Sequence, residues 1–152
     1  MHQREFDKLH GYYFEEIRVG MSARFEKVIR ERDVQAFAEI SGDVNPLHLD
    51  DAFASRTRAG ERVVHGMVTA SLISTLVGCR LPGPGCLWMG QVLKFVKPVR
   101  VGERVEAEAT VIETIADRQR VRMRTTCKVD DTTVVDGEAL VWVPSNEPSE
   151  PA

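Results

Sequence analysis

The sequence predicts a single α+β domain in which an antiparallel sheet curls around one long, buried helix. The segment Met67–Cys79 contains no charged residue, and a helix that is apolar on all sides is buried on all sides. Residues 104–111 and 120–129 alternate between apolar and polar or charged side chains. That alternation is typical of strands with one face in water and the other against a core.

The size and composition of the chain fit one domain. It has 152 residues, of which 43% are hydrophobic and 28% charged, enough for a sizeable core. We expect the domain to span residues 1–143. Residues 144–152 hold three prolines and no large apolar side chain, so we expect a disordered tail there.

Charge and cysteine content exclude several classes of protein. The formal net charge of −3 gives no reason to expect nucleic acid or an anionic membrane as a partner. The apolar segment is also shorter than the roughly 20 residues of a membrane span. The three cysteines form no C-x-x-C pair, and the charged N-terminus lacks a signal-peptide core, so we expect reduced thiols and a cytoplasmic protein.

The elements before the central helix are shorter. Residues 23–30 are predicted to form a strand. Asp33 has the features of an N-cap, with apolar residues at helical spacing behind it, and Gly42 ends that helix. Two turns follow, at Asn45-Pro46 and over residues 50–55.

Strands follow the central helix, after a turn rich in proline and glycine at residues 81–85. We expect four of them: a run ending at Pro98, the two alternating segments, and residues 134–143. The polar face of the third carries Arg120, Arg122 and Arg124. We expect these arginines to pair across to Glu106 and Glu108 on the strand before.

Asp43 and His48 are the candidates for chemistry. A carboxylate and an imidazole on either side of a turn fixed by Pro46 can converge on one water molecule. Addition of water to a conjugated thioester needs a base for the water and an acid for the α carbon. It also needs a donor for the charge that develops on the thioester oxygen, and Gly66, at the start of the central helix, offers a free N–H.

These residues belong to a longer pattern. The stretch Phe37–His48, FAEISGDVNPLH, with Ala54 six residues further, resembles the signature of MaoC-like (R)-specific enoyl-CoA hydratases. His65-Gly66-Met67 and the segment Phe95–Gly102 are similar to the same family. The likeness covers residues 12 to 143.

The resemblance implies a fold and a function. It implies a hot-dog fold and the reversible hydration of trans-2-enoyl-CoA to (R)-3-hydroxyacyl-CoA, of the type linked to polyhydroxyalkanoate synthesis. Coenzyme A would be part of the substrate, and we expect neither a separate cofactor nor a metal. It also implies a homodimer with active sites at the interface.

The resemblance assigns roles by position. Asp43 and His48 would be the catalytic pair, and the Gly66 N–H would be the oxyanion donor. Ser74 would line the acyl pocket, and Val77 and Leu140 would bound its depth. Asn45 is grouped with the substrate-binding residues, although an asparagine before proline is first a turn former. Candidates for the coenzyme A phosphates, by charge alone, are Arg56, Arg58, Arg62, Lys94, Lys97 and Arg100.

Two alternatives stay open. A hot-dog acyl-CoA thioesterase would need a carboxylate on the central helix, and Met67–Cys79 has none. A non-catalytic acyl-CoA-binding protein would leave the Asp43 and His48 pair idle. His65 is interpreted as a structural residue at the helix start, and no H-x-x-x-H or clustered Cys/His spacing supports a metal site.

Overall fold

The computed structural model describes residue 5 and residues 8–146. Two short 3-10 helices lie at Phe14–Glu16 and Ala116–Arg118. The remaining elements are β1 (Ser22–Val28), α2 (Glu31–Ser41), α3 (Pro46–Leu49), α4 (Asp51–Ala54), α5 (Gly66–Cys79), β2 (Leu87–Phe95), β3 (Arg104–Ile115), β4 (Arg120–Val129) and β5 (Thr132–Trp142).

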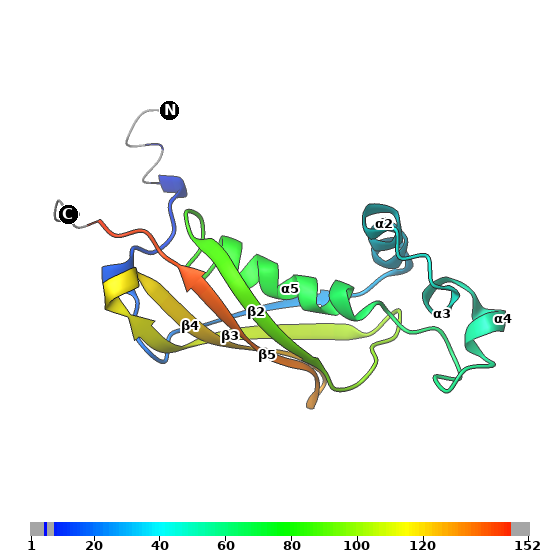
Figure 1. Cartoon of the computed structure of the whole chain (residues 1–152). Coiled ribbons are helices and arrows are strands. Elements are labelled where there is room, and N and C mark those ends of the chain that lie inside the picture. Colours follow the sequence, from blue (N-terminus) through cyan, green and yellow to red (C-terminus); the bar gives the residue numbers. More distant parts are fainter. Residues whose placement is uncertain (1–4, 6–7, 147–152) are drawn as a thin grey trace.

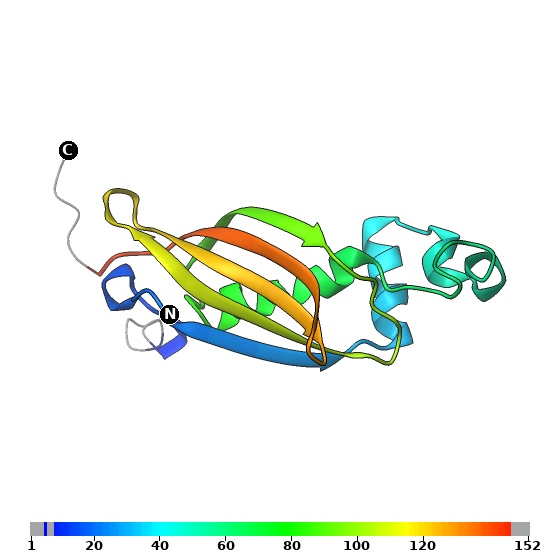
Figure 2. The same ribbon diagram turned by 90° about the horizontal axis from the view of Figure 1, so that it is seen from below.

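The strands form one five-stranded sheet in the order β1-β3-β4-β5-β2, and every neighbouring pair is antiparallel. The sheet curves under α5, which lies along its concave face (Figure 1). Figure 2 shows the opposite, outer face of the same sheet. A curved antiparallel sheet holding one long helix is the predicted hot-dog arrangement, and the predicted fold class is confirmed.

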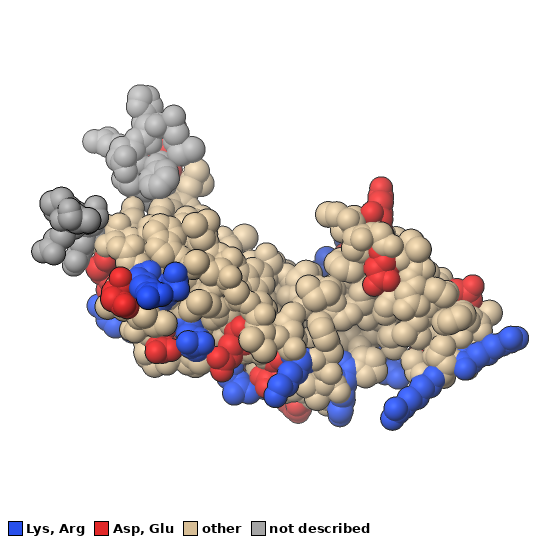
Figure 3. All heavy atoms as spheres, viewed as in Figure 1, with Lys and Arg blue, Asp and Glu red and all other residues tan. Residues whose placement is uncertain are grey.

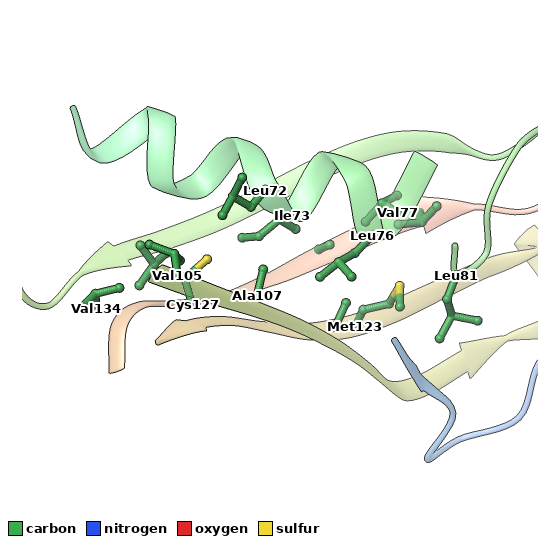
Figure 4. Close-up of a cluster of buried hydrophobic side chains, with 14 of the residues drawn as sticks. Leu72, Ile73, Leu76, Val77, Leu81, Val105, Ala107, Met123, Cys127 and Val134 are labelled. Atoms are coloured by element: carbon green, nitrogen blue, oxygen red, sulfur yellow. The ribbon is translucent and has the colours of Figure 1, made fainter. Parts of the chain in front are cut away.

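The core lies between α5 and the sheet (Figure 4). The alternation in the sequence produces it, because every second residue of β3, from Val105 to Val111, is buried. Ile73, Leu76 and Val77 of α5 are also buried and pack against them. This apolar contact fixes the position of α5, and therefore of its N-terminus, relative to the sheet.

The helices α2, α3 and α4 form a lobe beyond the N-terminal end of α5 (Figure 1). Arg62 ties the lobe together: two of its nitrogens lie 3.0 and 3.1 Å from the Glu31 carboxylate, and its Nε lies 2.8 Å from Asp51. The hydrogen bond from Arg62 lowers the pKa of Glu31, with help from Gln35. The lobe carries Asp43 and His48, so this network positions them.

The structure corrects the predicted start of α2. Arg30 is the N-cap, and the helix begins at Glu31 rather than after Asp33. The Asp33 carboxylate reaches back from the third helical position and accepts the Arg30 N–H at 2.8 Å. Asp33 therefore caps the helix from inside, as the third residue of a capping box does.

The expectation that the central helix is buried on all sides is wrong for this chain. Met67, Ser71 and Ser74 are exposed, and their spacing of four and three residues places them on one stripe of α5. Because two of the three are serines, hydropathy alone does not distinguish this stripe from the core face.

The first residues of the predicted disordered tail are held against the domain. The Pro144 carbonyl accepts the Phe14 N–H at 2.8 Å, and the Asn146 N–H donates to the Glu15 carboxylate at 3.2 Å. Residues 147–152 lie outside the described part of the chain. Among the described helices, none combines the length and the apolar character that a bilayer crossing requires.

Candidate active site

The loop between α2 and α3 holds the Asp43 carboxylate in place. Gly42 ends α2 in the left-handed region, at φ 76°, and turns the chain toward the pocket. The Asp43 N–H then donates to Ser41 Oγ at 3.1 Å, and Asp43 Oδ1 accepts the Asn45 N–H at 3.3 Å. Asn45 in turn accepts the Leu47 N–H at 3.0 Å and caps α3. Its side-chain oxygen is thus used for the turn, while its place among the substrate-binding residues stays a prediction.

His48 lies on α3 with one ring nitrogen anchored. Its Nδ1 is 2.7 Å from the Val63 carbonyl oxygen. A carbonyl only accepts, so Nδ1 carries the hydrogen and Nε2 of the neutral ring keeps a free lone pair. The sequence predicted His48 as a reactive residue, and the structure adds which nitrogen is available.

His65 is buried at the start of α5, where the sequence predicts a structural residue. It is 2% exposed, and its Nε2 lies 2.9 Å from the Asp43 carbonyl oxygen and 3.9 Å from Asp43 Oδ2. Its ring centroid is 3.9 Å from that of His48 and 5.0 Å from that of Phe37. No sequence spacing links residues 43 and 65, because the contact forms only when the lobe folds over the end of α5.

Gly66 is the first residue of α5, a helix of 14 residues. Within residues 8–146, no acceptor lies within hydrogen-bond distance of its N–H, so this donor and the positive end of the helix dipole are free for a ligand. A Cβ at this position would lie 2.8 Å from the Phe95 ring. Glycine is therefore required for the close packing of Phe95 at the helix start.

His48 and Gly66 line the same pocket, which has a volume of about 390 Å³. The other walls are apolar apart from Thr69 and Lys97. They come from the chain before α5, from its first turn and from the segment after β2: Val63, Val64, Met67, Thr69 and residues 95–99. The pocket thus brings an imidazole with a free ring nitrogen and a free main-chain N–H to one small, largely apolar space.

The predicted acyl-binding residues lie elsewhere in this chain. Ser74 is exposed on α5, Val77 is 1% exposed within the core, and neither lines the pocket. Leu140 is on the outer face of the sheet, because its neighbours Ala139 and Val141 point into the core. None of the three therefore lines the pocket that holds His48 and Gly66, and their place in an acyl pocket stays a prediction.

The basic residues divide into paired and unpaired ones. Arg62 and Arg100 are engaged with Glu31, Asp51 and Glu61, which leaves them less available for phosphate groups. Lys97 lines the pocket, and Arg56 and Arg58 are exposed just after α4. Figure 3 shows basic side chains projecting along the lower edge of the lobe, with acidic side chains on the surface above them.

Asp43, His48 and His65 each place a potential ligand atom within 4.8 Å of the others. Two imidazoles and a carboxylate are donors that a divalent transition metal takes. However, His65 Nε2 already donates to the Asp43 carbonyl, and it would have to leave that contact to coordinate through the same atom. The absence of a metal requirement stays a prediction.

Most of the chain is similar to one known protein family. Residues 15–133 match the family described as MaoC like domain, a range that includes the whole lobe, α5 and most of the sheet. The chain belongs to the MaoC-like family. This confirms the resemblance that the stretch from Phe37 to His48 indicated.

Relatives within the MaoC-like family cover nearly the whole chain. A "3-hydroxybutyryl-CoA dehydratase" of Methylorubrum extorquens is 49% identical over 144 residues, which is 95% of this chain and 92% of the relative. An "(R)-specific enoyl-CoA hydratase" of Rhodospirillum rubrum is 44% identical over 91% of this chain and 96% of its own length. The solved structure described as the (R)-hydratase from A. caviae involved in PHA biosynthesis superposes with a TM-score of 0.82 at 42% identity, covering 86% and 99% of the two chains.

Proposed function

We propose that this MaoC-like protein catalyses the (R)-specific hydration of trans-2-enoyl-CoA to (R)-3-hydroxyacyl-CoA, and the reverse dehydration. One observation supports this most directly. His48 and Gly66 line one pocket, and potential ligand atoms of Asp43, His48 and His65 lie within 4.8 Å of one another. The named activities of relatives that are 49% and 44% identical agree with it.

The geometry suggests how water is added. The thioester oxygen accepts the Gly66 N–H, which stabilises the negative charge that forms there. A water molecule held by Asp43 and His48 loses a proton to the pair while its oxygen bonds to the β carbon. The pair returns one proton to the α carbon, so that water is consumed and both side chains end as they began. The lone pair on His48 Nε2 makes it a competent acceptor, and which of the two groups is the base stays open.

The thioesterase alternative receives less support. Hydrolysis on this fold would need a carboxylate on α5 near the thioester, and Gly66–Cys79 has none. A purely binding role would not require Gly66 to expose its N–H beside His48. Neither alternative explains why the Asp43 carboxylate, the two imidazoles and a free helix N-terminus converge.

We further propose that the protein acts as a homodimer whose second copy completes the acyl pocket. β2 is an edge strand, and several large apolar side chains on and just after it are exposed, including Leu87, Val92 and Val96. Natural proteins pair or cover such edges. Ser74 lies on the open stripe of α5, so it contributes to an acyl pocket only when another chain covers that stripe.

The biological setting is also part of the proposal. The relative in A. caviae is described as involved in PHA biosynthesis, and for this chain we propose the supply of (R)-3-hydroxyacyl-CoA to such a synthesis. A cytoplasmic location agrees with the three free cysteines, Cys79, Cys86 and Cys127, since thiols stay reduced in that compartment.

The activity is tested with crotonyl-CoA. Hydration removes the absorbance of the conjugated thioester and leaves the thioester bond intact, whereas a thioesterase releases a free thiol that a thiol reagent detects. We expect loss of the conjugated band without thiol release, unchanged after treatment with EDTA. Thiol release, or loss of activity that added zinc restores, would contradict the proposal.

A further inference from the structure

His65 is a buried polar side chain that the addition of water does not itself use. It occupies the N-cap position of α5 but makes no side-chain capping hydrogen bond. Instead its Nε2 points away from the helix to the main-chain carbonyl of Asp43, at 2.9 Å. Since that carbonyl only accepts, Nε2 carries the ring hydrogen, and Nδ1 of the neutral ring is an acceptor.

The Nδ1 atom of His65 is buried without a partner among the described residues, and so is the hydroxyl of Thr69. Thr69 is 1% exposed and follows His65 by four residues, which places the two side chains on the same side of α5. A hydroxyl can donate and the ring nitrogen needs a donor. Buried polar groups are rarely left unpaired, and bound water commonly joins such groups.

We propose that Thr69, His65 and Asp43 form a positioning chain for the catalytic pair. The Thr69 hydroxyl donates toward His65 Nδ1 through one buried water molecule, which keeps the ring hydrogen on Nε2. Nε2 then holds the Asp43 main chain, and the ring face supports His48. This inference rests on the proposed hydratase function and names residues that act through Asp43 and His48 rather than on the substrate.

The proposed positioning chain explains how the exposed Asp43 carboxylate is held in a fixed place relative to α5. Asp43 is 49% exposed, and its other contacts come from its own loop, from Ser41 and Asn45. His65 is the contact that ties this loop to α5, and α5 also carries Gly66. Loss of the donor should therefore misplace the carboxylate relative to the oxyanion donor, lowering kcat and leaving KM, which depends on the pocket walls, nearly unchanged.

Two substitutions at His65 separate the donor from the packing. His65→Phe keeps a ring against His48 and Phe37 but has no donor, and we expect kcat for crotonyl-CoA to fall about 10- to 100-fold with KM within about twofold. His65→Gln keeps an N–H at similar reach, and we expect it to recover most of that loss. Equal activity of His65→Phe and the wild type, or equally low kcat in both variants, would overturn the donor role.

A matched set of variants tests the role of the Thr69 hydroxyl. Thr69→Val removes the hydroxyl at nearly constant shape, and Thr69→Ser keeps it. We expect kcat to fall about threefold to tenfold in Thr69→Val and to stay near the wild type in Thr69→Ser. Thr75→Val, on the same helix but outside the pocket, is the control. An unchanged kcat in Thr69→Val, or the same fall in Thr75→Val, would overturn the chain.

A measurement without turnover separates this inference from the proposed function. In the folded, full-length protein labelled with ¹⁵N-histidine, two-bond proton–nitrogen spectra report which ring nitrogen is protonated. We expect His65 as the Nε2–H form in the wild type and a mixture of forms in Thr69→Val. A wild-type His65 protonated on Nδ1 would overturn the positioning chain even if hydration is observed. Absence of hydration with the expected spectrum would overturn the function alone.

Discussion

The Nδ1 of His48 lies 2.7 Å from the carbonyl oxygen of Val63, and this contact leaves Nε2 as the nitrogen that can act on water. Val63 and Val64 themselves line the pocket, and the Val64 N–H donates to the Val99 carbonyl at 2.7 Å. The segment that orients His48 is thereby attached to the loop after β2. The Val63 carbonyl thus sets which His48 nitrogen is free, and the Val64 contact with Val99 holds this segment in place.

Replacement of either residue of the proposed catalytic pair should abolish most of the hydration activity. We expect Asp43→Ala and His48→Ala each to lower kcat by at least ~100-fold, the scale on which a positioned acid or base contributes. Steady-state hydration of crotonyl-CoA measures this, with thermal unfolding as the test of folding. Near-normal turnover in either folded variant would contradict the mechanism.

Gly66→Ala separates folding from catalysis. Alanine is the better helix former by about 1 kcal/mol, but its Cβ would lie 2.8 Å from the ring of Phe95, which lines the pocket and would have to shift. We expect unfolding stability to be roughly retained and kcat/KM to fall about 10- to 100-fold. The double variant with Phe95→Leu should recover part of the loss, because the smaller side chain gives way. No recovery would show that the clash with Phe95 is not the cause.

Val77 lies in the core and Leu140 on the outer face of the sheet, so their alanine variants should differ in unfolding free energy. Val77→Ala removes buried core volume, so we expect a loss of about 2 kcal/mol in the free energy of unfolding. Leu140→Ala, on the outer face of the sheet, should lose much less unfolding free energy. Kinetics with four-, six- and eight-carbon enoyl-CoA substrates should show no change in preference for Leu140→Ala. A shift toward longer chains would return Leu140 to the acyl pocket.

The Glu31 contact with Arg62 should make the lobe sensitive to acid. Arg62 lowers the pKa of Glu31 below its value in the unfolded chain, so its stabilisation is full above the unfolded pKa and is lost as pH falls through the folded one. Because Glu31 is 46% exposed, the contribution is only about 0.5 kcal/mol. Wild type should therefore exceed Glu31→Gln in unfolding free energy at neutral pH. A gap that persists below the folded pKa would contradict this.

The sequence was sufficient for the fold because its pattern is strong and local. The alternation of polar and apolar residues predicts β3 and β4, and the lack of charged residues predicts that α5 is the central helix. Pairing details did not: Arg122 contacts Glu113 and Arg124 contacts Asp136, rather than Glu106 and Glu108. The 3-10 turn at Ala116–Arg118 and a bulge between Val111 and Glu113 set this register, and neither leaves a periodic pattern.

The candidate site was only partly predictable for a related reason. Asp43, His48 and Gly66 were found because two short motifs contain them. His65 was given only a structural role, since its contact with Asp43 joins residues 22 positions apart. The resemblance assigns Ser74 to an acyl pocket, but a position in a motif does not reveal that Ser74 lies on the exposed stripe of α5.

The most direct test of the central claim is the configuration of the product. Purified protein is incubated with crotonyl-CoA in water, and the 3-hydroxybutyryl-CoA formed is resolved by chiral chromatography for the wild type and for His48→Ala. The account predicts (R)-3-hydroxybutyryl-CoA from the wild type and at most about one hundredth of that rate from the variant. Formation of the (S) product, or (R) product at equal rates from both proteins, would contradict it.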